Sequence, residues 1–161
     1  MRLSVIKPIF LLVLLLITSS SVLANLEVGD KAPNFILNDQ NNEAHQLSDY
    51  EGRWVILYFY PKDDTPGCTT QACDFRDAVK RIIASRSVVF GLSLDSVESH
   101  KRFSDKNNLP FSLLSDEEGV AAKSYDSLNN FMGYKSAKRN TFIIDPQGYL
   151  SKIYLSVDPK T

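Results

Sequence analysis

An apolar run that ends in a turn containing two prolines constrains the fold of this chain more than any other segment. Residues 54–60 are apolar or aromatic throughout and include two β-branched residues, which is typical of a strand buried on both faces of a sheet. Pro61 cannot donate to a sheet ladder, so we expect the strand to end there. Pro66 and Gly67 supply the turn chemistry that commonly precedes a helix. The sequence therefore predicts a strand–turn–helix unit.

The segment that begins at Cys68 is predicted to be an amphipathic helix. Its charged residues fall mostly on one side, and its apolar residues recur at helical spacing on the other, at Ala72, Phe75, Val79, Ile82 and Ile83. Cys68 therefore lies in the first helical turn, where free backbone N–H groups and the positive end of the helix dipole stabilise an anion. Such a position favours the thiolate, which is the reactive form of cysteine.

The sequence contains two cysteines, Cys68 and Cys73, five residues apart. On an intact helix this separation corresponds to a rise of about 7.5 Å and a rotation of about 140°, which places the two Cα atoms roughly 8–9 Å apart. A disulfide spans at most about 7 Å, so a bond between them would require the first helical turns to unfold. The spacing favours a reversible switch over a permanent structural bridge. It also differs from the C-x-x-C spacing of thioredoxin-like oxidoreductases.

The rest of the sequence alternates between expected strands and helices, which indicates an α/β layer fold. We expect one N-terminal hairpin and one helical turn before the central strand. The expected segments are a hairpin at 35–37 and 44–47, a helical turn at 47–50, strands at 87–94, 111–114, 141–144 and 149–155, and helices at 96–107 and 117–125.

Residues 1–24 differ from the rest of the chain and are predicted to be a cleavable signal peptide. They contain Arg2 and Lys7, an apolar run at 9–17 and a stretch of small residues that ends at Ala24. The apolar run is shorter than the roughly 20 residues needed to span a bilayer. We therefore expect export to a periplasmic or other extracytoplasmic or lumenal compartment, with no stable membrane association after cleavage. An uncleaved anchor is the alternative. Residues 25–161 are expected to form one domain.

Charge and motif content exclude several classes of function. The sequence has 18 basic and 19 acidic residues, and loss of residues 1–24 takes the formal charge from −1 to −3, which gives no electrostatic footprint for nucleic acid. The short basic run at 135–139 is more typical of a solvated loop than of a binding patch. His45 and His100 lack metal-ligand spacing and are expected to be surface or core histidines. With no phosphate-binding or dinucleotide-binding motif either, we expect no cofactor and no metal.

The residues around Cys68 resemble the signature of the peroxiredoxins. The run Pro61-x-x-x-Thr65-x-x-Cys68 matches the pattern P-x-x-x-[TS]-x-x-C, and residues 65–73 are similar to the Q-type subfamily, the bacterioferritin comigratory proteins. The resemblance extends over nearly all of residues 25–161, through similar segments at 32–35, 91–96, 109–116 and 139–145. It implies a thioredoxin-like fold with an added N-terminal β-hairpin. Relatives usually carry a further C-terminal helix after the segment matching 157–160, and this sequence stops at Thr161. We therefore expect either a truncated sequence or a sheet with one face less covered.

The resemblance implies a thiol-dependent peroxidase that reduces hydrogen peroxide and organic hydroperoxides. Cys68 would be the peroxidatic cysteine, which attacks the O–O bond and becomes a sulfenic acid. Cys73 would be the resolving cysteine and would form an intramolecular disulfide with it. A thioredoxin-like dithiol reductant would then restore both thiols by exchange. The Q-type resemblance also implies a monomer.

The same resemblance assigns roles to the residues around the thiol. Thr65 would contact both the peroxide and the thiolate through its hydroxyl, although a threonine at this position also fits a simple helix-capping role. Arg139 would bind two oxygens and the sulfur through its fixed fork of donors. Pro61 would shield the site, and the backbone N–H groups of Gly67 and of the residue after it would contact the substrate. Gln71 is a supporting residue.

Two other functions remain open on the residues alone. One is a thiol–disulfide oxidoreductase that acts on protein substrates, which would exchange disulfides but react with peroxide no faster than a free thiol. The other is a non-enzymatic secreted domain held by a structural disulfide, which would lose a few kcal/mol of stability on reduction.

Overall fold

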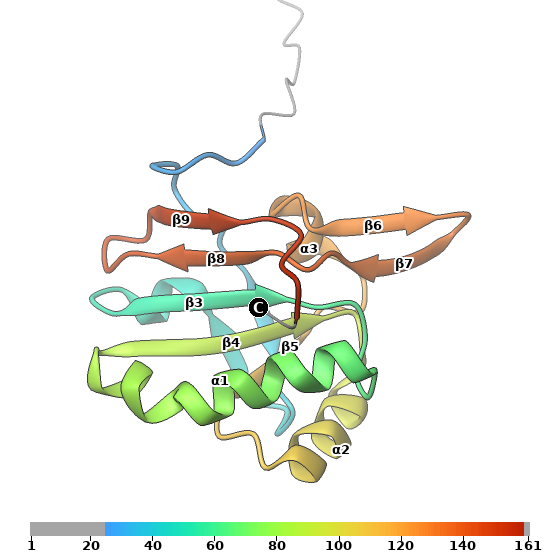
Figure 1. The fold of residues 1–161 in the computed structure, drawn as a ribbon. Coiled ribbons are helices and arrows are strands. Elements are labelled where there is room, and N and C mark those ends of the chain that lie inside the picture. Colours follow the sequence, from blue (N-terminus) through green and yellow to red (C-terminus); the bar gives the residue numbers. More distant parts are fainter. Residues whose placement is uncertain (1–24, 160–161) are drawn as a thin grey trace, which may run out of the picture.

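A seven-stranded mixed sheet organises residues 25–159, the part of the chain that the computed structural model describes. The predicted signal peptide lies outside the described residues. Strand order is β2-β1-β5-β4-β3-β8-β9, and a separate hairpin is formed by β6 and β7 (Figure 1). The elements are β1 (Ile36–Asn38), β2 (Ala44–Gln46), the 3₁₀ helix η1 (Leu47–Tyr50), β3 (Trp54–Phe59), α1 (Pro66–Ala84), β4 (Ser87–Ser93), α2 (Val97–Asn107), β5 (Ser112–Ser115), α3 (Val120–Ser124), β6 (Leu128–Phe131), β7 (Tyr134–Ala137), β8 (Thr141–Ile144) and β9 (Leu150–Tyr154).

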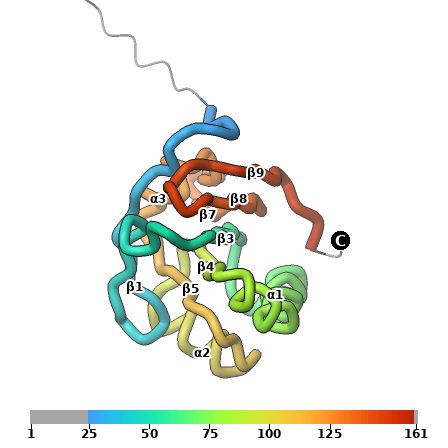
Figure 2. The backbone as a smooth tube through the Cα atoms, turned by 90° about the vertical axis from the view of Figure 1, so that its left-hand side faces the viewer, coloured from blue at the N-terminus to red at the C-terminus, as the bar shows by residue number. Residues whose placement is uncertain are grey.

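The central strand β3 is buried on both faces, as its sequence predicts. It pairs parallel with β4 and antiparallel with β8. Because side chains alternate along a strand, Leu57 and Phe59 enter one core while Tyr58 and Tyr60 enter the other. Helices α1 and α2 cover the Tyr58 face, and α3 with the N-terminal segment lies on the opposite face (Figure 2). The α/β layer organisation predicted from the sequence is confirmed.

The helix predicted over 117–125 is shorter than expected, and it begins only at Val120. The preceding Gly119 has a φ of 73°, in the left-handed region, so the backbone is not helical there. The Asp116 carboxylate accepts hydrogen bonds from the backbone N–H groups of Val120, Ala121 and Ala122 at 2.9, 3.2 and 2.8 Å. Burial nevertheless raises the pKa of Asp116 above its ordinary value. This carboxylate fixes where the helix starts.

The hairpin of β6 and β7 was not predicted. Residues 135–139 were interpreted as a solvated loop, which is wrong for residues 135–137, because these lie in β7. Ser136 and Ala137 are buried there. The segment escapes a sequence-based prediction because its largest apolar side chains, Phe131, Met132 and Tyr134, are exposed near the hairpin tip. They lack the alternation that normally reveals a half-buried strand.

The pairing of β3 with β8 brings two distant segments together at one end of the sheet. Tyr58 lies opposite Thr141, and the backbone N–H of Phe59 donates to the carbonyl of Asn140 at 2.8 Å. The residue before Asn140 is Arg139, so its backbone lies beside the end of β3, near the start of α1. Among the helices within residues 25–159, none is long and apolar enough to span a bilayer.

Candidate active site

Cys68 lies in the first turn of α1, as the sequence predicts, and its side chain is only 1% exposed. Thr65 is the residue before the helix, with an extended backbone, and Pro66 is the first helical residue. The first helical hydrogen bond runs from Thr69 N–H to the Thr65 carbonyl at 2.9 Å. The N–H groups of Gly67 and Cys68 precede this bond, so they belong to the end of the helix that favours an anion.

Arg139 supplies a positive charge directly to the Cys68 sulfur. Its Nη2 donates to Cys68 Sγ at 3.2 Å, and its Nη1 donates to Gln71 Oε1 at 3.1 Å. Gln71 is buried one helical turn after Cys68, so the amide holds the guanidinium over the thiol. The structure therefore brings together three of the residues singled out from the sequence.

Gly67 makes the approach of Arg139 possible. A Cβ atom on Gly67 would lie 3.0 Å from Arg139 Nη2 and 3.1 Å from Pro159 Cγ. The sequence explains this glycine by turn chemistry, but the structure shows that it leaves space for the guanidinium.

Replacing Gly67 by alanine is expected to slow the reaction with hydrogen peroxide up to about tenfold, because Arg139 Nη2 must move by some tenths of an ångström and even small misplacements of a catalytic group lower the rate. The helical backbone itself accepts alanine, so the melting temperature should not fall for conformational reasons. The check is the second-order rate constant for peroxide consumption, with Thr70→Ala in the same turn as the control. An unchanged rate constant in Gly67→Ala would contradict this role.

Thr65 and Pro61 lie in the loop between β3 and α1, and both are half-buried. The Thr65 hydroxyl donates to the Lys62 carbonyl at 3.0 Å and makes no capping hydrogen bond to the helix. Because its proton is engaged with Lys62, the hydroxyl oxygen keeps lone pairs for accepting a hydrogen bond. This geometry does not match the simple capping role that the sequence left open.

Cys73 is half-buried and lies on the same unbroken helix, and both cysteines are free thiols. An intact helix separates residues five positions apart by about 7.5 Å of rise, too far for a disulfide of ordinary geometry. A bond between Cys68 and Cys73 therefore requires the first turns of α1 to unwind.

Asp63 forms the centre of a buried hydrogen-bond network that the sequence analysis missed. Its carboxylate accepts from the Tyr60 hydroxyl at 2.7 Å, the Ser99 hydroxyl at 2.8 Å and His100 Nδ1 at 2.9 Å. Burial alone would raise the pKa of Asp63, but hydrogen bonds from His100, Tyr60 and Ser99 together hold it below its ordinary value. The backbone N–H of Asp63 also donates to Asp95 at 2.9 Å.

His100 of α2 also belongs to this network, and it is fully buried. The sequence analysis left a surface or a core position open for this histidine, and the structure places it in the core. Its Nε2 lies 3.2 Å from the Leu114 carbonyl, so each ring nitrogen faces an acceptor. The pair of Asp63 and His100 therefore ties the loop before Cys68 to α2 and β5. The sequence does indicate that His100 is buried, because it lies three residues from both Val97 and Phe103, on the apolar face of the helix.

Replacing Asp63 by asparagine is expected to lower the free energy of unfolding by about 1.5–3 kcal/mol at pH 7, because hydrogen bonds to a buried charge are lost. The pKa of Asp63 is lowered in the folded protein, so its contribution is present above the unfolded value of 3.8 and is lost as the pH falls through the folded value. Urea unfolding between pH 7 and pH 3 should therefore show a steeper loss below about pH 4 in the wild type than in the variant. Asp77→Asn, at an exposed carboxylate, is the control. Parallel pH profiles for Asp63→Asn and the wild type would contradict this prediction.

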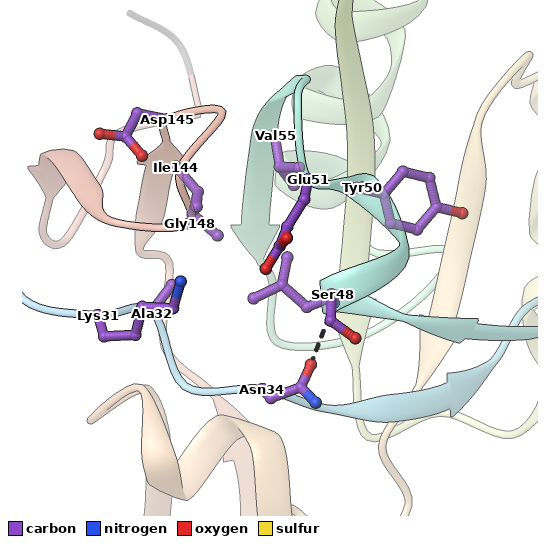
Figure 3. Close-up of a pocket in the computed structure, with 11 residues that line it drawn as sticks. Lys31, Ala32, Asn34, Ser48, Tyr50, Glu51, Val55, Ile144, Asp145 and Gly148 are labelled. Atoms are coloured by element: carbon purple, nitrogen blue, oxygen red, sulfur yellow. Dashed lines mark hydrogen bonds between the residues drawn. The ribbon is translucent and has the colours of Figure 1, made fainter.

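A pocket of about 230 Å³ lies on the opposite face of the sheet from α1 (Figure 3). Its lining includes the apolar residues Leu47, Val55 and Ile144 and the charged residues Lys31 and Glu51. None of the residues predicted to act in catalysis lines it. The thiol chemistry is therefore centred elsewhere, at the end of β3.

A second pocket, of about 250 Å³, has in its lining Gln71, whose amide contacts Arg139. It runs along α1 from Gln71 past Phe75 and Ile82, and Thr141 and Val157 close its other side. Most of its lining is apolar. Because Gln71 also holds Arg139, this pocket opens from the same end of the sheet as Cys68.

One group of three side chains within residues 25–159 has the spacing for a metal ion, namely Asp39, Glu43 and His45. The Asp39 carboxylate already accepts hydrogen bonds from two backbone N–H groups in its own turn, from the Ser112 hydroxyl and from His45. These donors together hold the pKa of Asp39 below its ordinary value, although burial acts in the opposite direction. The group is explained as a hydrogen-bonded turn next to β1.

Comparison with known proteins identifies relatives of this chain. Residues 28–153 match the model of the AhpC/TSA family. The chain is 45% identical over 139 residues to the peroxiredoxin Bcp of Bacillus subtilis, covering 84% of this chain and 88% of the relative. Its structure is similar to that of peroxidoxin BcpB from Mycobacterium tuberculosis, with a TM-score of 0.79, 32% identity and coverage of 83% and 89% of the two chains.

A third relative is the bacterioferritin comigratory protein of Xanthomonas campestris, with a TM-score of 0.75, 30% identity and coverage of 84% and 88%. These similarities confirm the thioredoxin-like fold and the family resemblance predicted from the sequence.

Proposed function

Since the chain belongs to the AhpC/TSA family and is a peroxiredoxin of the Bcp and peroxiredoxin Q type, we propose that it reduces hydrogen peroxide and organic hydroperoxides through a disulfide cycle between Cys68 and Cys73. Thiol-dependent peroxidase activity follows from the family. The observation that carries the proposal is the 3.2 Å contact between Arg139 Nη2 and the buried Cys68 sulfur at the start of α1.

In the first step the Cys68 thiolate attacks one oxygen of the hydroperoxide, and the O–O bond breaks. The sulfur is oxidised to a sulfenic acid, and the other oxygen leaves with a proton as water or an alcohol. The developing negative charge needs fixed donors at short range. We assign this role to Arg139, which contacts the Cys68 sulfur, and to the N–H groups of Gly67 and Cys68. We assign to the Thr65 hydroxyl the acceptance of a hydrogen bond from the incoming peroxide.

In the second step the Cys73 thiol attacks the Cys68 sulfenic acid. An S–S bond forms, and the sulfenic oxygen leaves as water. Because α1 holds the two thiols apart, this step requires unwinding of the first turns of the helix. A thioredoxin-like dithiol then attacks the disulfide, becomes oxidised itself and restores both thiols.

Organic hydroperoxides are included because of the apolar pocket beside the site. The pocket of about 250 Å³ that begins at Gln71 offers Phe75, Ile82 and Val157 to an alkyl group. The Xanthomonas campestris relative is described by its alkyl peroxide reduction activity. For the compartment, the pattern of residues 1–24 supports export as our proposal, with the reductant acting where the exported protein folds.

The test is competition for hydrogen peroxide between the reduced protein and horseradish peroxidase, whose oxidation is followed by absorbance. The method does not depend on Trp54, which lies at the start of β3, roughly 17 Å along the strand from the end that leads to Cys68. We expect a second-order rate constant at least a thousandfold above that of free cysteine, with no competition by protein whose thiols are alkylated. A rate equal to that of free cysteine, together with rapid exchange with protein disulfides, would favour the oxidoreductase alternative.

A further inference from the structure

The hydroxyl of Tyr58 is a buried polar group that the proposed chemistry does not use. Tyr58 is fully buried in β3, and its hydroxyl is the one buried side-chain nitrogen or oxygen within residues 25–159 that has no hydrogen-bond partner. Leaving such a group without a partner destabilises the arrangement that encloses it. An unpaired hydroxyl is therefore unusual enough in a well-packed core to require an explanation.

The elements around Tyr58 enclose its hydroxyl tightly. The ring stacks on Phe75 of α1 at 4.6 Å between centroids and on Tyr60 at 5.5 Å. Gly91 of β4 lies opposite Tyr58, and a Cβ atom there would approach both the Tyr58 hydroxyl and the Leu113 side chain to 2.7 Å. The backbone of Gly91 thus makes just enough room for the hydroxyl.

The Tyr58 side chain belongs to the core on which the redox centre packs. Tyr58 belongs to the same core cluster as Cys68 and Ala72 of α1. Burial raises the pKa of Tyr58 well above its ordinary value, and the negative charges of Asp63, Cys68 and Cys73 add to the effect. The hydroxyl therefore stays neutral. It lies near Gly91 and Leu113, while the ring that carries it packs on Phe75 of α1, the helix whose first turns must unwind for the disulfide to form.

We propose that the unpaired hydroxyl of Tyr58 destabilises the closed form of α1 and so sets how fast Cys73 reaches the Cys68 sulfenic acid. This rests on the proposed disulfide cycle. When the first turns unwind, Cys68 leaves the cluster around Tyr58 and the hydroxyl gains access to a hydrogen-bond partner. The hydroxyl gains a hydrogen bond only in the open form, so it shifts the equilibrium between the two forms toward the open one. The first step with peroxide takes place in the closed form.

Two reactions compete for the sulfenic acid. Attack by Cys73 gives the disulfide and water, whereas attack of the sulfenate on a second hydroperoxide breaks another O–O bond and gives a sulfinic acid and an alcohol or water. The first requires the open form and the second the closed form. Tyr58 therefore determines how much of the enzyme is lost to overoxidation at a given peroxide concentration.

Tyr58→Phe tests the proposal because it removes only the hydroxyl. We expect disulfide formation to slow about tenfold, and the fraction of sulfinic acid formed per turnover, measured by intact-protein mass spectrometry, to rise about tenfold. The rate constant of the first step should stay within twofold of the wild type. Backbone amides of the first two turns of α1 should exchange with deuterium more slowly in the reduced variant.

Tyr125→Phe is the matched control. Tyr125 is equally buried on the opposite face of the sheet, but its hydroxyl donates to the Pro33 carbonyl at 2.7 Å. This variant should lose stability without changing the partition between disulfide and sulfinic acid.

An unchanged partition and unchanged amide exchange in Tyr58→Phe would overturn the proposal, as would an equal slowing of both steps. Failure of the underlying disulfide cycle would look different, because the wild type itself would then form no Cys68–Cys73 disulfide after peroxide treatment.

Discussion

Replacing Cys68 by serine is expected to abolish peroxide reduction, with a fall in the second-order rate constant on the order of 10⁴-fold or more. A serine hydroxyl at neutral pH is a far weaker nucleophile than a thiolate, and the side chain that contacts this position, Arg139, is a cation and not a base. The fold should be retained, because the exchange of sulfur for oxygen removes little volume from the core around Tyr58. The measurement is the same competition for hydrogen peroxide, with circular dichroism to verify folding.

Cys73→Ser is the matched comparison, because it alters the other thiol on the same helix. The first step should proceed at the wild-type rate, but the cycle should stop at the sulfenic acid, which a dimedone adduct at Cys68 would reveal. Multiple turnover with a dithiol reductant should then fall sharply. Full peroxidase activity in Cys68→Ser, or a normal disulfide cycle in Cys73→Ser, would contradict the assigned roles.

Replacing Arg139 by leucine is the second prediction with a large expected effect. Loss of one well-placed donor to a developing anion commonly lowers a rate 10²- to 10³-fold, and we expect a fall of that order here. The substitution also leaves the Gln71 amide oxygen without its donor at 3.1 Å. Arg139→Lys should recover only part of the loss, because lysine has no planar fork to contact the sulfur and Gln71 together.

The neighbouring Lys138 provides the control for this experiment. Its ammonium group is exposed and donates to the Asp126 carbonyl at 3.0 Å, away from the thiol. Lys138→Leu removes the same charge from the same loop and should leave the rate constant within about twofold of the wild type. A similar loss in both variants would mean that the effect of Arg139 is long-range electrostatics and not its contact with Cys68.

Local patterns predicted the part of the site that is continuous in sequence. The apolar run at 54–60, the prolines and the helical spacing after Cys68 each constrain only their neighbours, and together they place the thiol at a helix start. Arg139 could not be found this way, since nothing near it in sequence distinguishes it from a surface arginine. Its assignment depended on resemblance to a family. The structure then supplied the reason for its position, which is the pairing of β3 with β8.

Contacts between distant segments explain what the sequence analysis missed. Asp63 and His100 are 37 residues apart, and neither has a local pattern that indicates a partner. Gly67 was interpreted as a turn residue, because the guanidinium that it accommodates comes from another part of the chain. The β6–β7 hairpin was missed because its exposed apolar tip conceals the strand pattern.

The nucleophile and the charge beside it are contributed by segments 71 residues apart. Neither segment alone can build the reactive centre, and β8 must pair with β3 before the guanidinium reaches the sulfur. A chain still being synthesised therefore lacks the contact between the guanidinium and the sulfur. The reactive centre is a product of the completed tertiary structure.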